Sequence, residues 1–160
     1  MSYIPHVAHT ALVAVALCLP VSSWATSSTP EELCDPHHPS VYTNYFLPGT
    51  DTLDVELDTF EIEDTWRYIE QLLELCDIGY VEVVAHSDPK TADPEHMRMS
   101  ASRAETVYSG LVGLGLPAHI SGYVGKGRSE PFPVAPHSSQ LNARTETTVY
   151  SRGLRVEPEK

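Results

Sequence analysis

The sequence predicts an α+β fold with the element order β-α-β-α-β-β, in which two helices pack on one face of a small mixed sheet. Three observations carry this prediction. Short segments rich in β-branched and aromatic residues recur along the chain. Two longer segments repeat apolar residues every three or four positions, the period of an α-helix. Turns marked by Gly or Pro separate the segments, and right-handed crossovers between them would place both helices on the same side of the sheet.

The first 25 residues differ in composition from the rest of the chain. Val7 to Leu19 is apolar and contains no Asp, Glu, Lys or Arg, and Ser23-Trp24-Ala25 supplies small residues where a signal peptidase cleaves. We therefore expect residues 1–25 to be a secretory signal peptide, although no Lys or Arg precedes the apolar run. A retained membrane anchor is the weaker alternative, because so short a run cannot span a bilayer. Lipid attachment through Cys18 is another.

The remaining sequence holds all 22 acidic and 10 basic residues, so its net charge is −12. A chain this acidic has no general attraction for nucleic acid or for anionic lipid. Any anionic partner must therefore be held by a local basic group. The prediction divides this part into an extended leader at 26–40, a single domain at 41–155 and a tail at 156–160. No transmembrane span is expected in it.

Two cysteines, Cys34 and Cys76, remain after removal of the signal peptide. An even pair in an exported chain indicates a disulfide, which would tie the leader to the end of the first helix. Two separate buried thiols are the alternative.

The first strand is predicted at Val41–Leu47, where β-branched and aromatic residues precede Pro48-Gly49. A helix is predicted over Thr59–Asp77, ending near Gly79. Its buried face consists of residues at helical spacing, namely Trp66, Ile69, Leu73 and Cys76.

The second strand is predicted at Tyr80–His86, and its nearly continuous apolar character favours burial on both faces. Asp93-Pro94-Glu95 reads as a helix start, with Asp93 as N-cap, and this helix runs to about Gly113. Its expected buried residues are Ala104, Val107, Tyr108 and Leu111. The remaining elements are a strand at His119–Val124, a long loop at Gly125–Asn142 and a strand at Thr145–Arg152.

Five short segments carry a resemblance to a known family. They are Phe46 with Leu53, Ala85-His86-Ser87-Asp88 (family G-H-T-D), His96–Ala104 (N-x-x-L-S-x-x-R-A), Gly125–Pro131 (G-x-G-x-x-x-P) and Asn142–Glu146 (N-R-R-V-E). In this order and spacing, the chain from about residue 45 to residue 150 resembles the OmpA-like C-terminal domain, a periplasmic peptidoglycan-binding module. The resemblance implies a location in the periplasm, in association with the outer membrane or the cell wall.

The resemblance also implies a ligand site. Asp88 follows the end of a strand and Arg103 lies on the next helix, so an acid and a guanidinium can share one pocket rim. Such a pair suits a zwitterion, and in the family these positions hold the meso-diaminopimelate of the peptidoglycan stem peptide. By resemblance, Asp88 accepts from the ammonium group and Arg103 pairs with the carboxylate. Arg144 matches the second Arg of the family N-R-R-V-E, which makes it a further ligand-binding candidate. His96 stands where the family has Asn, and its ring could still donate or accept one hydrogen bond with the ligand.

Two non-catalytic alternatives stay open at this point. Asp88 and Arg103 can form a structural ion pair without any ligand. The sequence also departs from the family pattern at Ala85, His96 and Ala143, among other positions. A domain that has lost wall binding would then serve as a protein-interaction or structural subunit of an envelope complex.

Catalysis is not expected. A nucleophile needs its base across a pocket, oriented by a third group, whereas consecutive residues such as His86, Ser87 and Asp88 alternate in direction along a strand. The chain has no G-x-S-x-G motif and no metal-ligand spacing such as H-E-x-x-H. No cofactor and no metal are therefore expected.

Overall fold

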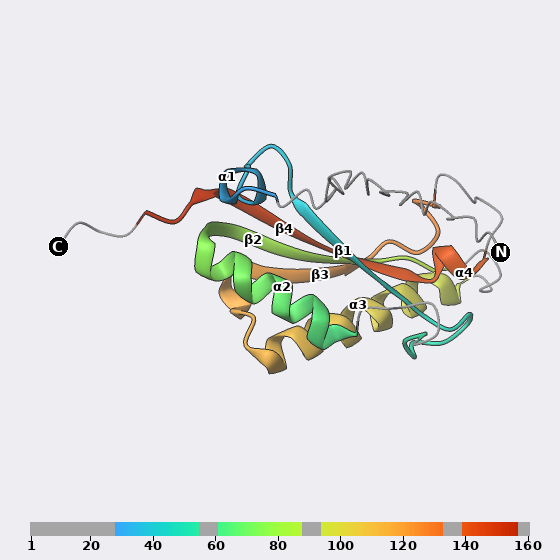
Figure 1. The fold of residues 1–160 in the computed structure, drawn as a ribbon. Coiled ribbons are helices and arrows are strands. Elements are labelled where there is room, and N and C mark those ends of the chain that lie inside the picture. Colours follow the sequence, from blue (N-terminus) through green and yellow to red (C-terminus); the bar gives the residue numbers. More distant parts are fainter. Residues whose placement is uncertain (1–27, 55–60, 88–93, 133–138, 157–160) are drawn as a thin grey trace, which may run out of the picture.

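The structure, a computed structural model, describes residues 28–54, 61–87, 94–132 and 139–156 (Figure 1). Within these residues, two long helices and four strands form the body of the domain, accompanied by three short helical segments. The elements are α1 (Pro30–Leu33), β1 (Ser40–Tyr45), α2 (Ile62–Leu75), β2 (Cys76–Ala85), α3 (Glu95–Leu114), the 3-10 helix η1 (Ala118–Ile120), β3 (Ser121–Gly125), α4 (Ser139–Asn142) and β4 (Arg144–Leu154). The predicted signal peptide and Asp88 lie outside the described residues.

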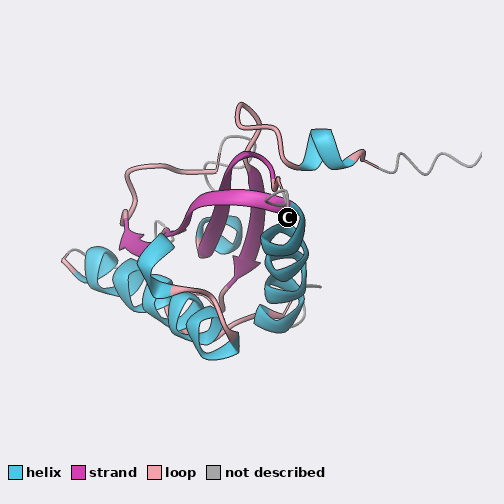
Figure 2. Ribbon diagram, turned by 90° about the vertical axis from the view of Figure 1, so that its left-hand side faces the viewer, coloured by secondary structure: helices cyan, strands magenta, loops and turns pink. Residues whose placement is uncertain are grey.

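The four strands form one mixed sheet in the order β1-β4-β2-β3. β4 is antiparallel to both β1 and β2, and β3 runs parallel to β2. Both long helices, α2 and α3, lie on the same side of this sheet (Figures 1 and 2). The α+β fold and the mixed sheet predicted from the sequence are thus confirmed. The C-terminal end of β2 and the start of β4 lie side by side at one end of the sheet. The candidate functional site lies at this end.

The core lies between the sheet and the two helices. On β2, Val81, Val83 and Ala85 are fully buried, whereas the intervening Glu82 and Val84 are only half-buried. The expectation that β2 is buried on both faces is therefore wrong for its middle, because helices cover only one face. The helices contribute a matching set of buried residues, namely Ile69, Leu72, Ala104, Val107 and Leu111. Tyr108 and Trp66 are partly buried at the margin of this core.

The junction between α2 and β2 differs from the prediction. α2 ends at Leu75 and β2 begins at Cys76, so no loop separates the helix from the strand. Gly79, expected to stop the helix, lies inside β2, where the pairing with β4 shifts register on either side of Ile78. Pairing with the long strand β4 thus extends β2 towards its N-terminus beyond what the apolar pattern indicates. At the start of α3, the N-cap is Pro94, which offers no side-chain hydrogen bond.

The leader is not extended throughout. Pro30–Leu33 forms a helical turn, closed by a capping box in which the backbones and side chains of Thr29 and Glu32 bond reciprocally. Cys34 follows directly and forms the predicted disulfide with Cys76, with the Cα atoms 5.4 Å apart. Both half-cystines are buried, so the leader is fastened to the start of β2.

Two glycines, the last residue of β3 and the second residue after it, let the chain approach α3 closely. A Cβ on Gly125 would lie 2.8 Å from Ala101 Cα and 2.7 Å from Ser100 Oγ, both in α3. Gly127 has a φ of 58° and donates its N–H to Ser100 Oγ at 2.9 Å. The loop that follows β3 therefore packs directly against the N-terminal half of α3. This close packing explains why the G-x-G segment has glycine at both positions.

Replacing Cys34 and Cys76 together by Ser should lower the free energy of unfolding by about 4 kcal/mol, because the bridge closes a loop with a sequence separation of 42 residues. Urea unfolding of the double variant and of the wild type, both without reductant, measures the difference. Equal midpoints would show that the leader contributes nothing to the stability of the domain.

Gly125→Ala should destabilise the domain by about 1–3 kcal/mol, since the methyl group meets the backbone of α3 rather than a flexible side chain. Gly113→Ala is the matched control: this helical glycine has open space at its Cβ position and positive φ is not required, so alanine should be neutral or stabilising by up to about 1 kcal/mol. Thermal unfolding of both variants gives the comparison. Similar effects at the two positions would contradict the close approach of the loop to α3.

Candidate functional site

Arg103 sits at the end of the sheet with its side chain fully buried. Its Nε donates to the carbonyl of Thr50 at 2.8 Å, its Nη1 to the carbonyl of His86 at 2.9 Å, and its Nη2 to that of Leu47 at 3.5 Å. The guanidinium also stacks over the ring of Phe46, 5.3 Å from its centroid. One side chain of α3 thus joins the turn that follows β1 to the end of β2.

Asp88 lies outside the described residues, which include the two residues that precede it, His86 and Ser87. His86 accepts from Arg103, and Ser87 donates its backbone N–H to Gly127 O at 2.9 Å. The Arg103 guanidinium therefore lies at the base of the segment that carries Asp88. The structure shows where the Arg103 side chain lies, and a ligand site shared by Arg103 and Asp88 stays a prediction.

His96 lies in the first turns of α3, seven residues before Arg103 and hence on the same side of the helix. Its ring is half-buried and lies against Gly127, where an added Cβ would be 2.7 Å from Cδ2. His96 and Arg103 therefore both approach the loop after β3 from the helical side of the sheet.

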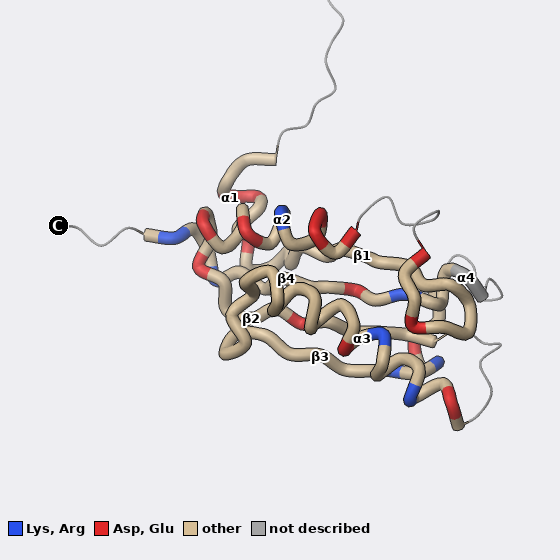
Figure 3. Tube along the Cα trace, turned by 90° about the horizontal axis from the view of Figure 1, so that it is seen from below, with Lys and Arg blue, Asp and Glu red and all other residues tan. Residues whose placement is uncertain are grey.

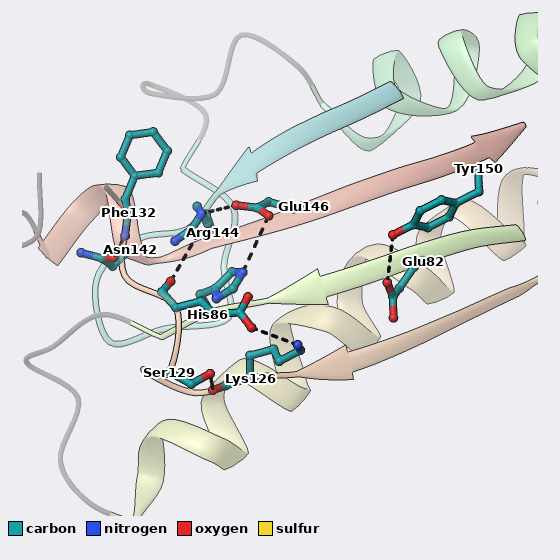
Figure 4. Close-up of polar contacts among 10 residues, drawn as sticks. Glu82, His86, Lys126, Ser129, Phe132, Asn142, Arg144, Glu146 and Tyr150 are labelled. Carbon is teal, nitrogen blue, oxygen red and sulfur yellow. Dashed lines mark hydrogen bonds and ion pairs between the residues drawn. The ribbon is translucent and has the colours of Figure 1, made fainter. Parts of the chain in front are cut away.

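Arg144, the first residue of β4, lies on the other side. Side chains alternate along a strand, so Arg144 and Glu146 project from the face opposite to that of the buried Thr145. Arg144 is 4% exposed; its Nε donates to Glu146 Oε1 at 2.7 Å and its Nη2 to Glu130 O at 3.4 Å. Its guanidinium stacks over Phe132, 5.3 Å from the ring centroid (Figure 4). Arg103 and Arg144 are thus not neighbours on one pocket rim.

His86 lies between the two arginines. Its backbone carbonyl accepts from Arg103, and its backbone N–H donates to Arg144 O at 2.8 Å. Its ring is 1% exposed, and Nε2 is 4.0 Å from Glu146 Oε2 (Figure 4). Neither ring nitrogen has a hydrogen-bond partner among the described residues. Burial, and next the nearby Arg144 charge, hold the pKa of His86 below its usual value.

Sequence reasoning missed the role of the His86 ring and of Glu146, Glu130 and Phe132. The signal for Glu146 was present, because an Arg-x-Glu spacing on a strand puts both charges on one face. No local pattern points to Glu130 or Phe132, since the loop brings them to Arg144 from a distance in sequence. Ser87 Oγ likewise has no partner among the described residues, so His86 and Ser87 do not form the base-nucleophile pair that an activated serine requires.

Acidic residues outnumber basic ones on the outer surface of α2. Glu63, Asp64, Glu70 and Glu74 recur along α2, and Figure 3 shows acidic positions on α1 as well. Within the described residues no helix combines the length and the apolar character needed to cross a membrane. Among the described residues, exposed cations are not confined to the end of the sheet that carries Arg103: Arg67 lies on α2, and Arg152 on β4 pairs with Asp77 near the start of β2.

Solved structures share this architecture. The chain is similar to the OmpA-like domain of FopA1 from Francisella tularensis subsp. tularensis SCHU S4, with 21% identity, a TM-score of 0.58 and coverage of 72% of this chain and 73% of that one. It is similar to the peptidoglycan-associated lipoprotein from Burkholderia pseudomallei (16% identity, TM-score 0.56, 76% and 99% covered). It is also similar to the periplasmic domain of Helicobacter pylori MotB (16%, 0.54, 72% and 78%). No family model matches the chain, and no curated protein matches it in sequence.

Arg103→Ala should lower the free energy of unfolding by at least about 3 kcal/mol, because three backbone carbonyls lose a charged donor at a buried position. Arg98→Ala on the same helix removes an exposed ion pair with Glu95 and should cost less than about 1 kcal/mol. Urea unfolding checks both variants. An Arg103→Ala protein as stable as the wild type would mean that water can replace the guanidinium at the three carbonyls without lowering the free energy of unfolding.

Proposed function

We propose that this chain, whose fold is that of OmpA-like domains, is a non-catalytic periplasmic module that binds peptidoglycan and serves envelope anchoring or integrity. The ligand group is the diaminopimelate of the stem peptide. The observation that carries the proposal is the position of the Arg103 guanidinium, held at the end of β2 by the carbonyl of His86, two residues before Asp88. The name of one structural neighbour, a peptidoglycan-associated lipoprotein, supports the same ligand class.

The chemistry follows from the two charges. Diaminopimelate carries an ammonium and a carboxylate at the end of its side chain. The Asp88 carboxylate would accept from the ammonium, and Arg103 would attract the carboxylate. Three carbonyl contacts hold the Arg103 guanidinium in place, so its orientation is set before a ligand arrives. His96 would add a polar contact from the same helix, whereas Arg144, on the opposite face, would act on this site only through the loop that it holds.

A second candidate function has its own support. The Arg103 side chain is fully buried, and Arg144 is engaged by Glu146 and Glu130. Both arginines thus have structural roles that need no ligand. This favours the alternative in which the domain no longer binds the wall and works as a protein-interaction or structural subunit of an envelope complex.

Wild-type protein should co-sediment with purified diaminopimelate-type peptidoglycan, and Asp88→Ala should weaken this binding at least tenfold, as expected for about 1.4 kcal/mol or more lost with the ammonium partner. Asp77→Ala is the matched control, because that exposed carboxylate pairs with Arg152 at the other end of β2. Circular dichroism confirms folding of each variant. Asp88 is the decisive position, since substitution of Arg103 also disturbs the fold.

Peptidoglycan with lysine in place of diaminopimelate tests the role of Arg103, the cationic residue of the proposed site. Lysine keeps the ammonium group and lacks the side-chain carboxylate, so binding should fall if Arg103 recognises that carboxylate. Equal binding to both polymers would contradict this recognition. Wild-type protein that stays in the supernatant at low and moderate salt would reject wall binding and favour the second candidate function.

A further inference from the structure

A cluster of charged side chains around two buried residues, His86 and Arg144, lies beside the proposed ligand site. We call it the His86 cluster. It consists of His86 at the end of β2, Arg144 and Glu146 on β4, and Lys126, Glu130 and Phe132 in the loop after β3 (Figure 4). The proposed ligand contacts do not use the imidazole, yet this ring is one of the largest fully buried side chains of the domain.

The loop of residues 126–132 is fastened around the end of β2 at its beginning. Lys126 donates its backbone N–H to Ala85 O at 2.8 Å, and Gly127 O accepts from Ser87. Gly127 also donates to Ser100 on α3. These bonds fix the start of the loop to both β2 and α3.

The far end of the loop is held by β4 and α4. Phe132 donates its backbone N–H to Asn142 Oδ1 at 2.7 Å, and its ring lies under the Arg144 guanidinium. Arg144 also donates to the carbonyl of Glu130. The Arg144 side chain therefore fastens this end of the loop, and its own position depends on Glu146 at 2.7 Å.

His86 is the charge-sensitive member of this arrangement. Its ring faces two cations, Arg144 and Lys126, and two anions, Glu146 and Glu130, while Arg103 lies on the other side at its carbonyl. Neither ring nitrogen has a partner among the described residues. A proton on the ring would place a charge in a buried site, next to a guanidinium. Glu146 Oε2, 4.0 Å from His86 Nε2, belongs to the carboxylate that holds Arg144.

We propose that His86 is an acid-sensitive latch: protonation of its ring draws Glu146 away from Arg144, loosens residues 126–132, and so weakens the ligand site at the adjoining end of β2. The link to that site is direct, because the His86 carbonyl holds Arg103 and the Ser87 amide holds Gly127. The latch is a property of the domain itself, and its effect on ligand binding rests on the proposed function.

The pH range follows from the direction of the shift. The pKa of His86 in the closed state is lowered by burial and by Arg144, below the ordinary value of about 6.5. A group with a lowered basic pKa contributes its full stabilisation above about pH 6.5 and loses it as the pH falls towards the closed-state pKa. At pH 5.5 the equilibrium constant for opening should therefore rise by up to about tenfold.

Hydrogen exchange of the Phe132 amide tests the latch without any ligand. After correction for intrinsic exchange rates, protection of this amide should fall by up to about tenfold between pH 7.5 and pH 5.5 in the wild type. His86→Gln should abolish the change. His119→Gln, at an exposed histidine in η1, should retain it. Unchanged protection in the wild type, or an equal change in His86→Gln, would overturn the proposal.

A second measurement covers the case in which His86→Gln does not fold. Titration of the His86 ring by NMR should give a pKa below 6.5 in the wild type, and Glu146→Gln should lower it further, because the nearest attractive charge is removed. A His86 pKa at or above about 6.5 in the wild type, or a His86 pKa that Glu146→Gln leaves unchanged, would refute the latch.

Co-sedimentation with diaminopimelate-type peptidoglycan at the two pH values completes the test. Binding by the wild type should fall at pH 5.5 and binding by the folded His86→Gln variant should not. A protein that binds no peptidoglycan at either pH rejects the proposed function, while the exchange measurement still decides the latch. Binding that stays constant while the Phe132 amide loses protection would overturn the proposed coupling.

Discussion

The end of the sheet depends on one buried guanidinium. Arg103 brings a permanent positive charge to a position without solvent exposure, which is costly unless hydrogen bonds compensate. Backbone carbonyls from two separate parts of the chain, the turn after β1 and the end of β2, supply that compensation. The guanidinium therefore does what an apolar core residue cannot: it satisfies backbone acceptors at a place where strand pairing has ended.

The backbone of His86 connects the Arg103 guanidinium to Arg144, whose side chain lies on the other face of the sheet. Its carbonyl is bound by Arg103 and its N–H by the carbonyl of Arg144, so the strand end is held from both sides. The Arg144 side chain then secures the loop above through Glu130 and Phe132. Two arginines that look equivalent in the sequence thus have different environments, one on the helical side and one on the open side. The Arg103 side chain contacts the carbonyl of His86, two residues before Asp88, whereas the Arg144 side chain contacts the loop of residues 126–132.

Much of the fold could be predicted because its signals are local. The helical spacing of Ile69, Ala104, Val107 and Leu111 indicates which residues face the sheet, and all four are buried. The disulfide was predictable from cysteine count and expected export. One error arose where a distant segment decides: pairing with β4 extends β2 back to Cys76, so Gly79, expected to end the helix, lies inside β2 at the register shift between Ile78 and Tyr80. The leader turn at Pro30–Leu33 was missed although Thr29 and Glu32 supply a capping box.

The sequence by itself determined the class of fold and the face that each long helix packs on the sheet, and it predicts Arg103 as the cation of the candidate site. These depend on periodicity and on residue order, which the chain carries locally. Only the tertiary structure decided that Arg103 is fully buried against carbonyls, that Arg144 lies on the opposite face, and that His86 is enclosed between them. The physical reason is that burial and the pairing of charges are set by segments distant in sequence, which no local pattern encodes.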